Sequence, residues 1–187
     1  SSDLLFDLTW PCWRDGGCQA PVEDDQSASM GQVTYPTQGM AAVVSTIRDA
    51  GARQPILLGG LDYANDLSHW LEFAPDDDQL VAAIHSYDFK ACNDKSCWDD
   101  VLGPIAETVP VLTSELGARR PEKGPGKSYV ERYLAWADEH SLGALFWVWA
   151  DHPADPMALV ADEDGRPTAY GRQARSWLLG HVPGSGG

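Results

Sequence analysis

The sequence predicts an α/β protein with a parallel sheet, and three observations support this prediction. Short apolar segments alternate five times with segments of helical periodicity, which places helices between parallel strands. Four of the apolar segments end in residues suited to chemistry. The 187 residues are 43% hydrophobic, enough for one domain with a core. Doubly wound sheets and barrels both fit, but no glycine-rich nucleotide fingerprint follows any of these segments.

The expected elements follow from local patterns. Strands are expected where apolar runs are bounded by Gly, Pro or polar residues, over residues 3–8, 55–60, 80–85, 109–117 and 143–149. Helices are expected from the spacing of apolar residues, over 37–50, 98–107, 127–140 and 169–179, with a shorter one capped by Asn65 or Asp66 and running to Phe73. Residues 9–36 are expected to form a long polar loop, and loops of that length are usually functional or stapled.

The charge of the chain limits its partners. The formal net charge is -15, which argues against binding to nucleic acid or to an anionic membrane, because both attract basic proteins. A neutral or cationic partner fits, and so does solubility alone. No apolar run has the length of a transmembrane helix. No signal peptide is visible at Ser1, so we expect a mature, trimmed or fragmentary chain.

The four cysteines form two close pairs, Cys12 with Cys18 and Cys92 with Cys97. Neither pair has the tight spacing or the nearby histidines of a metal site, so no metal is expected. Two local disulfides and a secreted, extracellular protein are the favoured interpretation. Four reduced thiols in a cytosolic protein are the alternative.

The candidate chemistry lies at the ends of the expected strands. Glu115 closes a buried strand, where a carboxylate is costly unless it faces a polar site; the alternative is a solvated loop residue. His85 and Tyr87 are two residues apart at a strand end, so their side chains share a face. Trp147 offers an apolar plate to a sugar, although a core position is the more frequent one for Trp.

Taken together, these segments resemble glycoside hydrolase family 5, the cellulase-rich family of retaining (β/α)8 enzymes, and the match is closest to secreted actinobacterial members. The resemblance covers most of the chain. It rests on an ordered set of short motifs, Leu5-Phe6-Asp7-Leu8, Cys12-Trp13-Arg14-Asp15-Gly16-Gly17-Cys18, Gly39-Met40, Leu58-Gly59-Gly60-Leu61-Asp62-Tyr63, His85-Ser86-Tyr87, Thr113-Ser114-Glu115-Leu116-Gly117 and Trp147-Val148-Trp149.

The resemblance implies a fold and a set of roles. The fold is a TIM-barrel-type α/β domain, here a single partial catalytic domain over 1–187 with about five βα units, corresponding to strands four to eight. Glu115 matches the nucleophile, which forms a glycosyl-enzyme intermediate. Tyr87 matches the tyrosine that hydrogen-bonds the nucleophile, and His85, Trp147 and Tyr63 match substrate-binding positions, with Tyr63 where relatives often have Trp. No cofactor is implied.

The sequence also departs from the family pattern. The Asn-Glu-Pro that supplies the acid/base does not occur in the 187 residues, and segments matching strands one to three are missing. We therefore expect an impaired retaining hydrolase of β-1,4-glucan or a related β-glycan. The alternatives are a non-catalytic carbohydrate-binding remnant and a truncated barrel fragment that self-associates through its open sheet edges.

Overall fold

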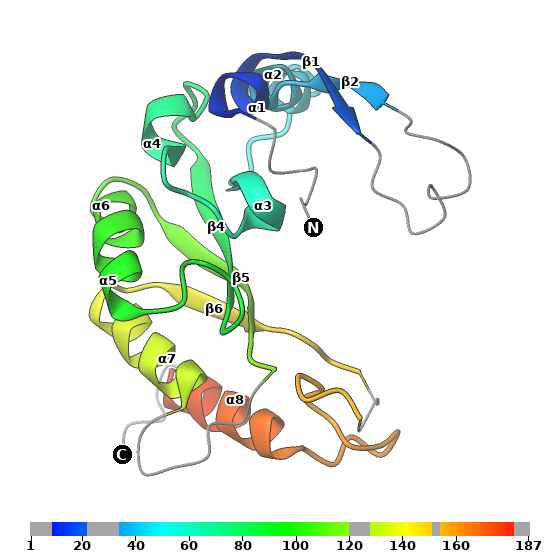
Figure 1. The fold of residues 1–187 in the computed structure, drawn as a ribbon, viewed down its shortest axis with the longest axis vertical. Coiled ribbons are helices and arrows are strands. Elements are labelled where there is room, and N and C mark those ends of the chain that lie inside the picture. The colour runs from blue at the N-terminus through cyan, green and yellow to red at the C-terminus, as the bar shows by residue number, and fades with distance from the viewer. Residues whose placement is uncertain (1–8, 22–33, 120–127, 151–153, 182–187) are drawn as a thin grey trace. The chain divides into compact units, whose positions relative to one another are not determined.

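A computed structural model describes residues 9–21, 34–119, 128–150 and 154–181 (Figure 1). Its strands form a four-stranded sheet in the order β3-β4-β5-β6 and a separate pair, β1-β2. The chain divides into two compact units, residues 1–84 with 99–112 and residues 85–98 with 113–187. Strands β4 and β5 each begin in the first unit and end in the second. A single domain over 1–187 stays a prediction.

Four of the five expected strands are present, and the fifth, 3–8, lies outside the described residues. They are β3 (Ile56–Gly59), β4 (Leu80–Tyr87), β5 (Val111–Gly117) and β6 (Gly143–Phe146). Strands β3 and β4 are parallel, with Ile56 opposite Leu80. Strand β6 ends before the predicted residue 149, because the N–H of Val148 donates to Met157 O instead of to the sheet.

The polar segment 9–36, expected to be a loop, contains regular structure in its described parts. Helix α1 (Trp10–Asp15) is capped by Thr9 and has a proline in its first turn. Strands β1 (Gly16–Pro21) and β2 (Thr34–Gln38) form an antiparallel pair. The Thr37 hydroxyl bonds both the N–H and the carbonyl of Cys18. The prediction of a loop was based on the lack of apolar periodicity. The helix and the strand pair are instead stabilised by the capping bond of Thr9 and the cross-strand bonds of Thr37.

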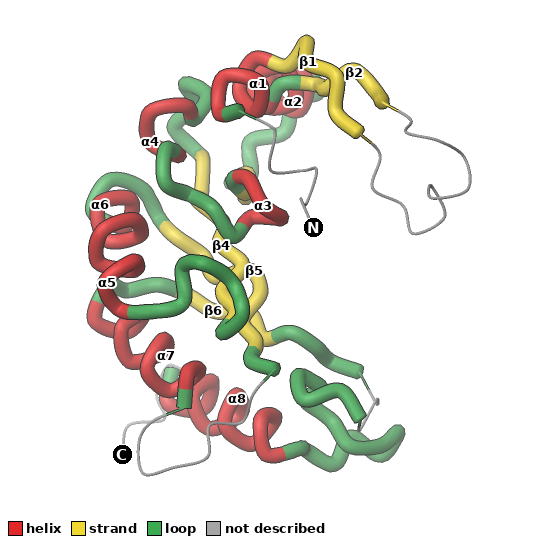
Figure 2. Tube along the Cα trace, in the orientation of Figure 1, coloured by secondary structure: helices red, strands yellow, loops and turns green. Residues whose placement is uncertain are grey.

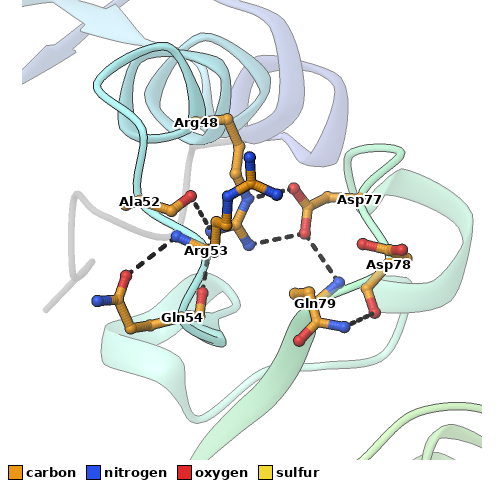
Figure 3. Close-up of polar contacts among 7 residues, drawn as sticks. All are labelled: Arg48, Ala52, Arg53, Gln54, Asp77, Asp78 and Gln79. Carbon is orange, nitrogen blue, oxygen red and sulfur yellow. Dashed lines mark hydrogen bonds and ion pairs between the residues drawn. The ribbon is translucent and has the colours of Figure 1, made fainter.

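The first unit also holds α2 (Met40–Asp49), α3 (Leu61–Ala64), α4 (Trp70–Phe73) and α6 (Gly103–Ala106). Its core includes Trp70, whose indole N–H donates to Leu58 O at 2.9 Å. Arg48 on α2 forms a two-bond ion pair with Asp77, at 2.7 and 2.9 Å, and also donates to the carbonyls of Ala52 and Gln54 (Figure 3). This guanidinium ties α2 to the segment that leads into β4.

Neither Asn65 nor Asp66 caps the short helix as expected, since α4 begins after His69. Asp66 accepts from the N–H of Ser68 at 2.8 Å. The Asn65 amide donates to the carbonyls of Asp62 and Tyr63, which lie in a left-handed turn with φ of 49° and 52°. The side-chain bonds of Asn65 support backbone conformations that L-residues rarely adopt.

The second unit holds the short α5 (Lys95–Cys97) and two long helices, α7 (Tyr129–Glu139) and α8 (Ala169–Gly180), shown in Figures 1 and 2. A π-helical turn at Trp98–Leu102 links the end of α5 to α6, so the predicted helix 98–107 is confirmed in two pieces, this turn and α6. Helix α7 begins with a capping box formed by Ser128 and Glu131. Its predicted apolar face is buried, as are Trp98 and Trp136 beside it; the face comprises Tyr129, Val130, Tyr133, Leu134 and Ala137.

Candidate active site

Glu115 lies on β5 in the second unit, with its side chain 23% exposed. Its strand neighbours Thr113 and Leu116 are fully buried. The strand therefore has one face in the core while the carboxylate remains open to solvent on one side. This accessibility is what a reacting group needs.

Two side chains from β4 meet the Glu115 carboxylate at the same atom. The Tyr87 hydroxyl donates to Oε2, and His85 Nδ1 lies 3.3 Å from Oε2. The prediction that His85 and Tyr87 share a face is confirmed, because both reach one carboxylate oxygen across the sheet. Among the described residues, none is a hydrogen-bond partner of the other oxygen, Oε1.

Gly117 makes room for this arrangement. A Cβ at this position would lie 2.9 Å from Cε1 of the Tyr87 ring and 3.0 Å from the sulfur of Met157. Any larger residue would displace the tyrosine that bonds Glu115. The glycine two residues after the candidate nucleophile is thus explained by close packing against its hydrogen-bond donor.

Burial sets the protonation of both donors. Burial, and then the hydrogen bond to Glu115, raise the pKa of Tyr87 far above its ordinary value, so its hydroxyl keeps its proton. Burial lowers the pKa of His85 below its ordinary 6.5, against the opposing effect of the Glu115 charge. At neutral pH the imidazole is uncharged, and with its proton on Nδ1 it donates to Oε2.

The strands that carry these residues are fixed to α7 by two buried hydroxyl pairs. Ser86, between His85 and Tyr87, lies 2.8 Å from the Tyr129 hydroxyl. Thr113, two residues before Glu115, lies 2.7 Å from the Tyr133 hydroxyl. Burial raises the pKa of Tyr133 to about 12, so both tyrosines act as neutral partners.

The other predicted substrate-binding residues lie at strand ends. Trp147 follows β6, is 41% exposed, and donates its backbone N–H to Leu116 O, next to Glu115. Trp149 is 74% exposed. Tyr63 belongs to the first unit, in the left-handed turn after β3, and is 54% exposed. The structure thus brings His85, Tyr87 and Glu115 together, while the roles of Trp147 and Tyr63 stay predictions.

Both predicted disulfides are formed, Cys12–Cys18 in the first unit and Cys92–Cys97 in the second. In the second, the Trp98 indole N–H donates to Cys92 O at 3.2 Å. The described residues hold no cluster of His, Cys, Asp or Glu that could bind a metal. They also hold no helix that is long and apolar enough to cross a membrane.

Phe89 and Arg119 are neighbours of the site that the sequence patterns did not single out. The Phe89 ring lies 5.0 Å from the Tyr87 ring, and the Arg119 guanidinium lies 4.0 Å from the Phe89 centroid. Phe89 continues the two-residue spacing of His85 and Tyr87, which was an available signal. The contact between Phe89 and Arg119 joins two separate segments of the chain. A pattern of neighbouring residues in the sequence therefore does not predict it.

Comparison with known proteins identifies the family that the chain resembles. Residues 26–153, more than half of the chain, match the cellulase family, glycosyl hydrolase family 5. No curated protein matches.

Several solved structures share the fold. A β-glucanase from Saccharophagus degradans is 25% identical with a TM-score of 0.59, over 75% of this chain and 46% of that one. A β-mannanase from Streptomyces thermolilacinus, solved with mannohexaose, is 19% identical with a TM-score of 0.58, over 83% of this chain and 51% of that one. The chain thus spans about half the length of these proteins, and the predicted fold class, a partial (β/α)8 barrel, is confirmed.

Proposed function

Since the chain belongs to glycosyl hydrolase family 5, we propose that it acts on β-1,4-glucan or a related β-glycan with retention of configuration, through Glu115 as the nucleophile. The convergence of Tyr87 and His85 on Oε2 of Glu115 is the observation that carries this proposal. It holds the carboxylate in one orientation and leaves Oε1 to attack. The β-glucanase of Saccharophagus degradans, also solved with cellotetraose, supports a β-glucan as the substrate class.

In the proposed step, Glu115 Oε1 forms a bond to the anomeric carbon while the glycosidic C–O bond breaks and its electron pair goes to the departing oxygen. The product of this step is a glycosyl ester of Glu115. Water then attacks its anomeric carbon, releases the sugar and restores the carboxylate. Uncharged donors suit this role, because they orient the carboxylate without neutralising the charge that makes it a nucleophile.

The departing oxygen needs a proton when the leaving group is a sugar. The 187 residues contain no Asn-Glu-Pro to supply it, and general acid catalysis contributes about 10²–10⁴-fold. We therefore propose that these 187 residues cleave aryl glycosides, whose leaving group departs as a stable anion without a proton. Polysaccharide, whose leaving group is a sugar, should be cleaved at a very low rate.

The test compares an aryl β-cellobioside that has a good leaving group with soluble cellulose. Cleavage of the aryl glycoside alone, lost in Glu115→Gln, supports the proposal, and the α or β configuration of the first product measures retention. Cleavage that persists in Glu115→Gln would assign the nucleophile elsewhere. Efficient cleavage of both substrates would show that another group supplies the acid.

Carbohydrate binding without cleavage is the second candidate function. The exposure of Trp147 and Trp149 favours it, because sugar C–H faces lie well on open aromatic rings. Retarded migration in a glucan gel, with no cleavage of either substrate, would establish binding alone. Trp149→Ala would then weaken the retardation.

Secretion and self-association are further parts of the proposal. Two disulfides support an oxidising compartment. Strand β6 ends the order of the described sheet, and an unpaired strand edge is a template for pairing with another chain. Sedimentation at increasing concentration tests self-association, and a concentration-independent monomer would refute it.

A further inference from the structure

Phe89 and Arg119 form a small platform beside the Glu115 site. Phe89 is 40% exposed, and its ring contacts that of Tyr87, the residue that bonds Glu115. The Arg119 guanidinium lies 4.0 Å from the Phe89 centroid. A guanidinium stacked on a ring keeps its N–H donors directed outward in its own plane, where they can bind a planar anion.

The position of Arg119 is set by its backbone. Its N–H donates to Asp88 Oδ1 at 2.9 Å, which joins the end of β5 to the residue after β4. Among the described residues, the Arg119 side chain contacts no carboxylate. The platform is therefore held from the main chain, while its charge remains available to a ligand.

The sequence that follows the strand of Glu115 is locally basic. The chain carries a net charge of -15, yet four of its 13 basic residues fall within residues 119–127, together with one acidic residue. These basic residues are Arg119, Arg120, Lys123 and Lys127. A local positive charge directly after the strand of Glu115 opposes the field of an otherwise acidic protein.

We propose that Phe89 and Arg119 form a subsite for the carboxylate-bearing sugar units of an acidic β-glycan. This inference rests on the proposed function and names a substrate class for it. The exposed part of Phe89 beside the stacked guanidinium, 40% of the residue, gives an apolar contact for the sugar unit. Arg119 binds the carboxylate of that unit through two parallel N–H···O bonds. An acidic protein without such a subsite would repel an anionic glycan.

The test uses two polymers with the same backbone, neutral hydroxyethyl cellulose and anionic carboxymethyl cellulose, in affinity gel electrophoresis. The wild-type protein is expected to bind the anionic polymer about fivefold more tightly at low salt, and this preference should shrink in 0.5 M NaCl. Arg119→Gln should weaken binding to the anionic polymer about tenfold, as expected for loss of a charge-assisted pair. Its binding to the neutral polymer should be unchanged.

Two further variants separate geometry from charge. Arg119→Lys keeps the charge without the planar fork and should retain only part of the preference. Arg53→Gln removes the same charge from an exposed arginine of the first unit and should behave as wild type. Near-ultraviolet circular dichroism confirms that each variant is folded.

The outcomes distinguish this inference from the proposed function. Equal or weaker binding of the anionic polymer by the wild type, or a preference that survives Arg119→Gln, would overturn the subsite and leave the proposed function intact. No binding to either polymer, together with no cleavage of the aryl β-cellobioside, would overturn the proposed function and the subsite with it.

Discussion

Asp77 in the first unit and Glu115 in the second are both partly buried carboxylates with close hydrogen-bond donors, but the donors differ in charge. Asp77 receives two bonds from the permanent cation Arg48 and one from the N–H of Gln79. The bond from Arg48, with that from Gln79, lowers the pKa of Asp77 to about 2. These three bonds all serve the local structure of the first unit (Figure 3).

Glu115 is oriented by a tyrosine and a histidine that are uncharged at neutral pH. The Tyr87 hydroxyl donates to Oε2, and His85 Nδ1 lies 3.3 Å from the same oxygen. A cation would hold the carboxylate more firmly and would also oppose the transfer of its negative charge to a substrate carbon. The charge of the donors, more than their number, therefore separates the structural carboxylate Asp77 from the proposed nucleophile Glu115.

The largest expected effect comes from removing the tyrosine donor. Tyr87→Phe should lower kcat for the aryl β-cellobioside by about 10²–10³-fold, the usual cost of one preorganised donor. The free energy of unfolding should change little, since the ring remains in place. An unchanged kcat would show that Glu115 does not depend on the uncharged donor Tyr87. It would contradict the functional contrast drawn between Glu115 and Asp77.

The hydroxyl pairs behind the site give the next effect. Tyr133→Phe leaves the buried Thr113 hydroxyl unpaired and should lower the free energy of unfolding by about 1–3 kcal/mol, measured by urea denaturation. Adding Thr113→Val should recover most of this loss, because both partners are then apolar. If the double variant is no more stable than the single one, the pair does not hold the Glu115 strand.

The Asp77 ion pair should appear in the pH dependence of stability. Its folded pKa of about 2 lies below the ordinary 3.8, so its contribution is complete above pH 3.8 and is lost as the pH falls toward 2. In Asp77→Asn the urea midpoint should therefore depend less on pH between pH 3.8 and pH 2 than it does in the wild type. The neighbouring Asp78→Asn is the matched control and should keep the wild-type slope, whereas equal slopes for wild type and Asp77→Asn would contradict the assignment.

The smallest effect concerns His85. The pKa of His85 in the folded protein lies below its ordinary 6.5. Between these two pKa values the unfolded chain binds more protons than the folded one, so the free energy of unfolding rises as the pH increases toward 6.5. Titration of the His85 ring by NMR, assigned with His85→Gln, should give a pKa below 6.5. Glu115→Gln should lower it further, because the Glu115 charge raises it; an increase would exclude the contact.

Local periodicity was sufficient to predict the four described strands of the parallel sheet and the shared face of His85 and Tyr87, because strand alternation is set by adjacent residues. The N-terminal helix and hairpin escaped prediction, since Thr9 and Thr37 stabilise them through side-chain bonds without an apolar pattern. The pairing of Phe89 with Arg119 was also missed. Such contacts depend on how distant segments meet in the fold.

The two hydroxyl pairs between α7 and the strands join early and late parts of the chain. His85, Tyr87 and Glu115 all precede Tyr129 in the sequence, while Tyr129 and Tyr133 bond Ser86 and Thr113 beside them. During synthesis, His85, Tyr87 and Glu115 therefore emerge before the helix whose hydroxyls bond their strands. We expect these three side chains to reach their fixed arrangement only after α7 has docked on the strands.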